Sequence, residues 1–128
     1  MKLKSPLVLA SGIWGLSSGS MIRAYNEGCG AVTSKSCSMK PRKGHKNPTV
    51  VFYDNIMLNA VGFTNPGVDL MKEELKEVVR ARVPLIASVF AGSIEEFAQI
   101  AQLIEEVKPQ MIEIDISCPN VDLSLIHI

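Results

Sequence analysis

The sequence has no excess of charge of either sign and no long apolar run. Its 128 residues include 13 Lys plus Arg and 13 Asp plus Glu, so the formal net charge is zero. This balance argues against a strongly basic surface for nucleic acid and against a polybasic membrane patch. No apolar stretch approaches the roughly 20 residues that span a bilayer, and the charged N-terminus lacks the apolar segment of a signal peptide. We therefore expect neither nucleic acid nor a membrane as a partner.

Cysteine is scarce and unevenly placed. The three cysteines, Cys29, Cys37 and Cys118, are odd in number and form no CxxC pair. A disulfide framework and a zinc site are both disfavoured, so we predict no metal site and a reducing, cytoplasmic location. Cys29 and Cys37 have no evident partner, and we interpret both as structural.

Short apolar segments alternate along the chain with segments of helical periodicity. Ser93 and Glu96 fit a capping box at the start of one such helix, and a polar, basic loop covers residues 35–49. Strands that alternate with helices favour parallel βαβ units. The predicted strands lie near residues 7–10, 31–34, 85–89 and 111–116, and the predicted helices near 18–26, 68–81 and 94–107.

A doubly wound sheet and a (β/α)8 barrel both fit this alternation, but two features favour the barrel. No G-x-G-x-x-G follows the first strand. Polar residues also stand at the carboxyl ends of the strands, where barrel enzymes build their sites. Since a complete barrel uses roughly 250 residues, we predict an α/β fold that is the N-terminal half of a TIM barrel, with strands ordered in space as in the chain. The strand-end residues are Ser11, Lys35, Ser88, and Asp115 with Cys118.

The last six residues differ in character from the rest. Residues 123–128 read Leu-Ser-Leu-Ile-His-Ile, which one frame of a common sequencing adapter encodes. We expect the native barrel segment to be residues 1–122 and the tail to be non-native; the alternative is a genuine apolar segment.

Two residues at strand ends could carry chemistry. Cys118 lies between Ser117 and Pro119, where a thiol of lowered pKa could act as a base or nucleophile; alternatively it is a small buried hydrophobe. Lys35 could hold an anionic substrate or stabilise charge on a cofactor, or it could be one solvated lysine among several in its loop.

Two further residues have polar groups in apolar surroundings. Asn59 has an amide that suits a heterocyclic amide such as a pyrimidine, although an asparagine also forms turns. Asp115 and Glu113 share one face of a predicted strand, opposite Ile112 and Ile114. Two inward acids are costly unless paired or functional, and alternation alone does not say which face is inward.

An ordered set of motifs resembles the class 1 dihydroorotate dehydrogenases, and most closely their class 1B archaeal or bacterial type. The resemblance runs from about residue 3 to residue 121. Each motif is weak alone, but the ordered set is highly specific. The motifs are Ala10-Ser11-Gly12, Lys35-Ser36, Lys40-Pro41-Arg42-x-Gly44, Asn47-Pro48, Met57-Leu58-Asn59-Ala60-Val61-Gly62, Asn65-Pro66-Gly67 and Ile116-Ser117-Cys118-Pro119-Asn120.

The resemblance implies a barrel that binds FMN at the carboxyl ends of its strands and oxidises (S)-dihydroorotate to orotate in de novo pyrimidine synthesis. It implies that Cys118 removes the proton from C5 while a hydride passes from C6 to N5 of the flavin. Lys35 would contact both the flavin and the orotate carboxylate. The implied substrate contacts also include Asn59, Ala60, Val61, Gly62, Phe63, Asp115 and Asn120, and the implied FMN contacts are Ala10, Ser11, Lys35, Ser36, Ser88 and Asp115.

The chain departs from the family pattern at two positions and in its length. Asp115 replaces the usual asparagine, and a carboxylate cannot donate a hydrogen bond. Phe63 replaces the usual leucine, an apolar exchange. The late strands, whose loops usually bind the phosphate, lie beyond the half barrel expected here.

Two alternatives and two partners remain to be stated. A related flavin barrel of the dihydropyrimidine dehydrogenase type shares a similar Cys-Pro loop, but the segments at 40–44 and 57–60 favour dihydroorotate. The chain by itself is expected to be an inert fragment. At full length the resemblance implies a homodimer, and in class 1B a partner subunit that carries FAD and an iron–sulfur cluster.

Overall fold

The computed structural model describes residues 2–116 and contains one parallel sheet. Its strands are β1 (Val8–Leu9), β2 (Ala31–Thr33), β5 (Leu85–Val89) and β6 (Met111–Ile114). They lie in the order β1-β2-β5-β6, and each neighbouring pair is parallel. The predicted strand order is confirmed, because spatial order follows chain order with no reversal about a switch point.

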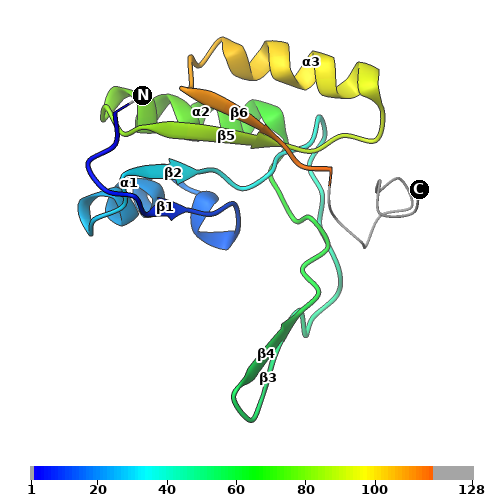
Figure 1. Ribbon diagram of the computed structural model, residues 1–128. Coiled ribbons are helices and arrows are strands. Elements are labelled where there is room, and N and C mark those ends of the chain that lie inside the picture. The colour runs from blue at the N-terminus through cyan, green and yellow to red at the C-terminus, as the bar shows by residue number, and fades with distance from the viewer. Residues whose placement is uncertain (1, 117–128) are drawn as a thin grey trace.

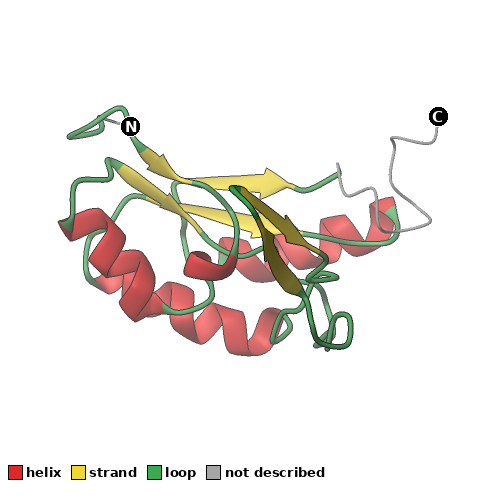
Figure 2. Cartoon of the chain, turned by 90° about the horizontal axis from the view of Figure 1, so that it is seen from below, coloured by secondary structure: helices red, strands yellow, loops and turns green. Residues whose placement is uncertain are grey.

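Three α-helices cover one face of the sheet (Figures 1 and 2). They are α1 (Ser18–Asn26), α2 (Val68–Arg80) and α3 (Ile94–Glu105), and a short 3-10 helix, η1 (Ile13–Gly15), precedes α1. No helix among the described residues is long and apolar enough to cross a membrane. This single helical layer on a parallel sheet is the arrangement of part of a (β/α)8 barrel.

The hydrophobic core lies between the sheet and these helices. On β5 the fully buried side chains Leu85, Ala87 and Val89 alternate with Ile86 and Ser88, as a strand's period of two requires. The helices supply the other side of the core with their apolar stripes. The fully buried helical side chains include Met21, Met71, Leu75, Val78, Ile100 and Ile104.

Side-chain caps fix where two helices begin. Ser17 Oγ accepts a hydrogen bond from the Ser20 amide at the start of α1. The predicted cap of α3 is confirmed, since Ser93 Oγ accepts from the Glu96 amide. The Glu96 carboxylate accepts from the Gly92 amide, one residue earlier than a capping box requires.

A β-hairpin that the sequence did not predict extends away from the sheet (Figure 1). It consists of antiparallel strands β3 (Val50–Tyr53) and β4 (Ile56–Asn59), joined by a two-residue turn in which Asp54 has φ of 52°. Polar–apolar alternation is absent because exposed apolar residues such as Phe52, Tyr53 and Met57 occupy both strands. The pattern that identifies a half-buried strand was therefore missing.

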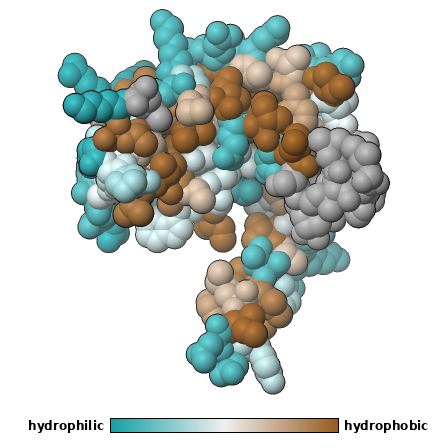
Figure 3. Space-filling model, viewed as in Figure 1, coloured by the Kyte–Doolittle hydropathy of each residue, from teal (hydrophilic) through white to brown (hydrophobic). Residues whose placement is uncertain are grey.

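Within residues 2–116, no helix covers the second face of the sheet (Figure 2). The strand register pairs Ile86 with Met111 and Ser88 with Glu113 on this face. Figure 3 shows apolar side chains gathered over it. Val8 and Met111, whose strand neighbours Leu9 and Ile112 pack against the core, are 42% and 56% exposed. In a complete barrel this face is the packed interior.

Candidate active site

A cleft lies at the carboxyl ends of the parallel strands. Ala10 and Ser11 follow β1, Lys35 and Ser36 follow β2, and Asp115 follows β6. Because parallel strands end at the same edge of a sheet, segments distant in the chain meet here. The cleft has a volume of about 500 Å³ and is lined by Ala10, Ser11, Lys35, Ser36, Glu113, Ile114 and Asp115.

The structure brings together all six residues predicted to contact the cofactor. Five of them line the cleft. The sixth, Ser88, is fully buried in β5 and joins the cleft through Ser36, with 3.0 Å between the two hydroxyl oxygens. The sequence placed these residues at strand ends, and the parallel topology makes them neighbours.

Ser36 is the hub of a hydroxyl network. Its Oγ donates to Asp115 Oδ2 at 2.9 Å and lies 3.2 Å from Ser11 Oγ. Ser36 is 1% exposed and Ser88 is 0% exposed, so bulk water does not compete for these bonds. The Ser88 amide donates to Ser34 Oγ, which fixes β5 against the end of β2. The network therefore ties three strand ends to one carboxylate.

The backbone of Lys35 is held by η1. The Lys35 amide donates to the Gly15 carbonyl at 2.9 Å. A Cβ atom on residue 15 would lie 2.4 Å from the Lys35 nitrogen and 2.7 Å from the Thr33 oxygen, so only glycine permits this approach. The main chain that carries the Lys35 side chain is thus fixed at the cleft.

Two stacked rings lie beside the Lys35 ammonium. Lys35 Nζ is 5.3 Å from the ring centroid of Phe63, whose ring stacks on Phe90 with centroids 4.2 Å apart. The Arg42 guanidinium lies 5.5 Å from the Phe90 centroid. Phe63 has φ of 57°, a left-handed conformation that is rare for a bulky residue. Such strained positions cluster at functional sites.

Of the predicted substrate contacts on the 59–63 segment, the ring of Phe63 contacts the cleft residue Lys35. Asn59 ends β4 and pairs with Val50. The hydrogen bonds described for the next residues run to the preceding loop: the Ala60 amide donates to Thr49, and the Val61 carbonyl accepts from His45. These bonds tie the 59–62 segment to the basic loop rather than to the cleft.

The acidic face of β6 points into the cleft. Ile112 packs against the hydrophobic core, whereas Glu113 and Asp115 line the cleft with Lys35. The structure thereby answers which face of this strand is inward. Glu113 shares the face of Asp115 in the sequence pattern but was not among the predicted site residues; the period-two pattern was the signal that could have added it.

Cys118 and Asn120 lie outside the described residues, and their roles stay predictions from the sequence. Within residues 2–116 no group of three or more His, Cys, Asp or Glu could hold a metal ion. Cys37 is fully buried in the core, and burial raises the pKa of its thiol to about 11. Its thiol is therefore neutral at physiological pH.

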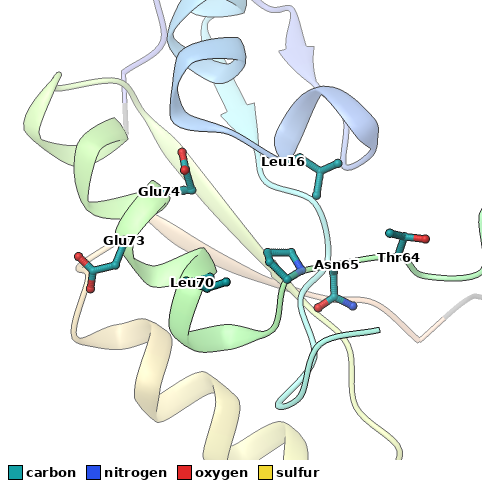
Figure 4. A pocket seen from close by; sticks show the side chains of 7 residues that line it. Leu16, Thr64, Asn65, Leu70, Glu73 and Glu74 are labelled. Atoms are coloured by element: carbon teal, nitrogen blue, oxygen red, sulfur yellow. The ribbon is translucent and has the colours of Figure 1, made fainter. Parts of the chain in front are cut away.

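A second hollow, of about 540 Å³, lies between α2 and the segment around Asn65 (Figure 4). Its polar side chains make hydrogen bonds within the fold. Glu74 accepts from the Ser18 amide at the start of α1, and Asn65 accepts from the amides of Gly67 and Ser38. We assign it no ligand.

Comparison with known proteins places the chain in one family. A family model described as dihydroorotate dehydrogenase matches residues 1–128. The catalytic subunit of dihydroorotate dehydrogenase B (NAD(+)) from Methanothermobacter thermautotrophicus is 46% identical over 120 residues, which are 94% of this chain and 39% of that protein. The same subunit from Pyrococcus abyssi is 41% identical over 120 residues, again 94% of this chain and 40% of the relative. The chain thus spans about 40% of the length of these relatives.

A solved structure shows the same fold. The crystal structure of DHODH from Eimeria tenella, in complex with ferulenol, matches 95% of this chain and 36% of its own chain with a TM-score of 0.82 at 19% sequence identity. The predicted partial (β/α)8 barrel is confirmed by this likeness, and the predicted resemblance to class 1B by the relatives of type B. The chain belongs to the dihydroorotate dehydrogenase family.

Proposed function

We propose that the chain is the N-terminal part of a catalytic subunit that oxidises (S)-dihydroorotate to orotate in pyrimidine biosynthesis, with FMN as the hydride acceptor. The supporting observation is the convergence of six residues, from four strand ends, at one cleft and its hydroxyl network. The family resemblance implies flavin contacts for all six.

The chemistry of the cleft fits the polar edge of a flavin ring. That edge carries carbonyl oxygens and ring nitrogens that accept hydrogen bonds, and one imide N–H that donates. The cleft offers the Lys35 ammonium as a donor, and the Asp115 and Glu113 carboxylates as acceptors. Ala10 has no side chain beyond Cβ, which permits close approach of a planar ring. The described residues therefore suit the ring; the phosphate is expected on later strands.

The chain's own residues would bind the substrate and move one proton. Lys35 attracts the substrate carboxylate, since an ammonium beside a carboxylate in a partly desolvated cleft binds more strongly than in water. The thiolate of Cys118 would take the proton from C5. FMN, when bound, would accept the hydride. The Asn120 amide would hold the pyrimidine edge and so fix which carbon faces the base.

The names of the relatives describe a catalytic subunit that uses NAD(+), which supports a partner electron-transfer subunit for the complete protein. From the class 1B resemblance we also propose that this partner carries FAD and an iron–sulfur cluster and that the catalytic subunit is a homodimer. The scarcity of cysteine supports our proposal of a cytoplasmic location. The 128-residue chain by itself is proposed to be inactive. The second candidate, a dihydropyrimidine dehydrogenase type of barrel, is disfavoured by the motifs at 40–44 and 57–60.

The test is reduction of bound flavin by substrate in the full-length protein. We expect dihydroorotate, and not dihydrouracil, to bleach the flavin absorbance under anaerobic conditions. Lys35→Met should weaken orotate binding, whereas Lys46→Met, which removes an exposed lysine from the same loop, should not. Bleaching by dihydrouracil alone would favour the second candidate and refute the proposal.

A further inference from the structure

The hydroxyl network at the cleft has only one possible proton arrangement. Ser36 Oγ lies 2.9 Å from Asp115 Oδ2, 3.2 Å from Ser11 Oγ and 3.0 Å from Ser88 Oγ. A carboxylate has acceptor positions only, and a hydroxyl has a single proton. Ser36 therefore gives its proton to Asp115, and both Ser11 and Ser88 must donate to Ser36.

This arrangement fixes what Ser11 can offer to a ligand. Ser11 lines the cleft, but its proton is committed to Ser36, so it presents lone pairs alone. Asp115 and Glu113 line the same cleft and, as carboxylates, are acceptors as well. Reversal of the network would leave no proton between Ser36 Oγ and Asp115 Oδ2, which are 2.9 Å apart, so that lone pairs would face each other at a site where Ser36 is 1% exposed.

The cleft therefore contains hydrogen-bonding groups of both polarities. Lys35 lines it as a donor and suits a carbonyl or carboxylate of a ligand. The side formed by Ser11 and Asp115 suits a ligand edge with an N–H donor, because an edge of carbonyl oxygens would place lone pairs against lone pairs. The carboxylate at position 115 sets this polarity for Ser11 as well as for itself.

We propose that Asp115 is a specificity-determining residue: through Ser36 it orients the Ser11 hydroxyl so that this side of the cleft binds the N–H of a heterocyclic imide. The inference rests on the proposed function and deepens it. The flavin ring and the 2,4-dioxopyrimidine ring of orotate both contain such an N–H, so the shared chemistry is the imide donor, and the experiment distinguishes its two sources.

The test compares ligands with and without the N–H in the full-length protein and its Asp115→Asn variant. An asparagine amide has the same shape but can donate to Ser36, which frees Ser36 to donate to Ser11 and Ser11 to donate to the ligand. FMN against 3-methyl-FMN, measured by fluorescence quenching in the apoprotein, probes the flavin source. Orotate against its 3-methyl derivative, measured from the spectrum of bound flavin, probes the pyrimidine source.

We expect the preference for the parent ligand over its N-methyl derivative to fall about tenfold in Asp115→Asn, the equivalent of one hydrogen bond. Any steric clash of the methyl group occurs in the wild type and in the variant alike, so it cancels when their preferences for the parent ligand are compared. The fall should appear for the ligand that contacts Ser11 and not for the other. Asp69→Asn removes the same charge from the exposed first turn of α2 and should leave both ratios unchanged.

Ser36→Ala provides a second route should Asp115→Asn not fold, since loss of the hub releases the Ser11 proton and should reduce the same preference. Equal preferences in the wild type and in both variants, for both ligand pairs, would overturn the inference while leaving dihydroorotate oxidation intact. A wild-type protein that binds neither FMN nor orotate would overturn the proposed function and the inference together.

Discussion

Replacing Phe63 by leucine should weaken the protein through loss of ring interactions rather than loss of burial. Phe63 is 7% exposed, and leucine retains an apolar side chain at that site. The backbone stays at φ of 57°, and both residues are strained there, so the conformational cost largely cancels. What disappears is the stack with Phe90, at 4.2 Å between centroids, and the contact with Lys35 Nζ at 5.3 Å.

The expected loss follows from these two contacts. An aromatic pair contributes about 0.5–1.5 kcal/mol beyond its buried area. A cation over a ring at a partly exposed site contributes about 0.5–1 kcal/mol. Phe63→Leu should therefore lower the free energy of unfolding by about 1–2.5 kcal/mol. The share due to the stack should appear as a coupling of about 0.5–1.5 kcal/mol between Phe63→Leu and Phe90→Leu.

The assay is urea unfolding of the full-length protein, followed by circular dichroism, for the two single variants and the double variant. Phe97→Leu is the matched control, because it is the same substitution at a phenylalanine that packs against the core from α3. Its combination with Phe63→Leu should be additive to within about 0.5 kcal/mol. A Phe63–Phe90 coupling no larger than that of the Phe63–Phe97 control would refute the reasoning.

Four further outcomes are expected. In the full-length protein Cys118→Ala should lower turnover with dihydroorotate by about 10²–10⁴-fold, the usual contribution of a general base, and unchanged turnover would reject this residue as the base. Ser93→Ala should cost about 1 kcal/mol in urea unfolding, because it removes the N-cap of α3; a loss of only a few tenths would argue against the cap. Burial raises the pKa of Cys37 from 9.0 to about 11, so the unfolded chain releases this proton at lower pH than the folded chain. The contribution of this thiol to stability should be constant below about pH 9 and be lost as the pH rises toward 11, and Cys37→Ala should remove that part of the decline. The 128-residue chain alone should self-associate and bind FMN weakly, because the edges of β1 and β6 are unpaired within the described sheet and Val8 and Met111 are exposed on its inner face; a monomer in size-exclusion chromatography with stoichiometric flavin would contradict this.

Local sequence rules determined most elements of the fold. Buried runs such as 31–34 and 85–89 became β2 and β5, the apolar spacing from Val68 onward became α2, and the Ser93 cap began α3. These signals are local, since they depend on the period of a strand or helix and on the amides of a first turn. The β3–β4 hairpin was missed because its apolar residues lie on both faces and remain exposed, so they follow no burial period.

The tertiary structure decided how the site is arranged. The sequence placed polar residues at four strand ends and showed two faces on the last strand, but only the packing of helices against Ile112 turned Glu113 and Asp115 toward the cleft. The partners of Ser36 and Phe63, which are Asp115 and Phe90, come from other strand ends and cannot be inferred from spacing. Alternation is symmetrical between the two faces of a strand, and that symmetry is broken only when one face is buried.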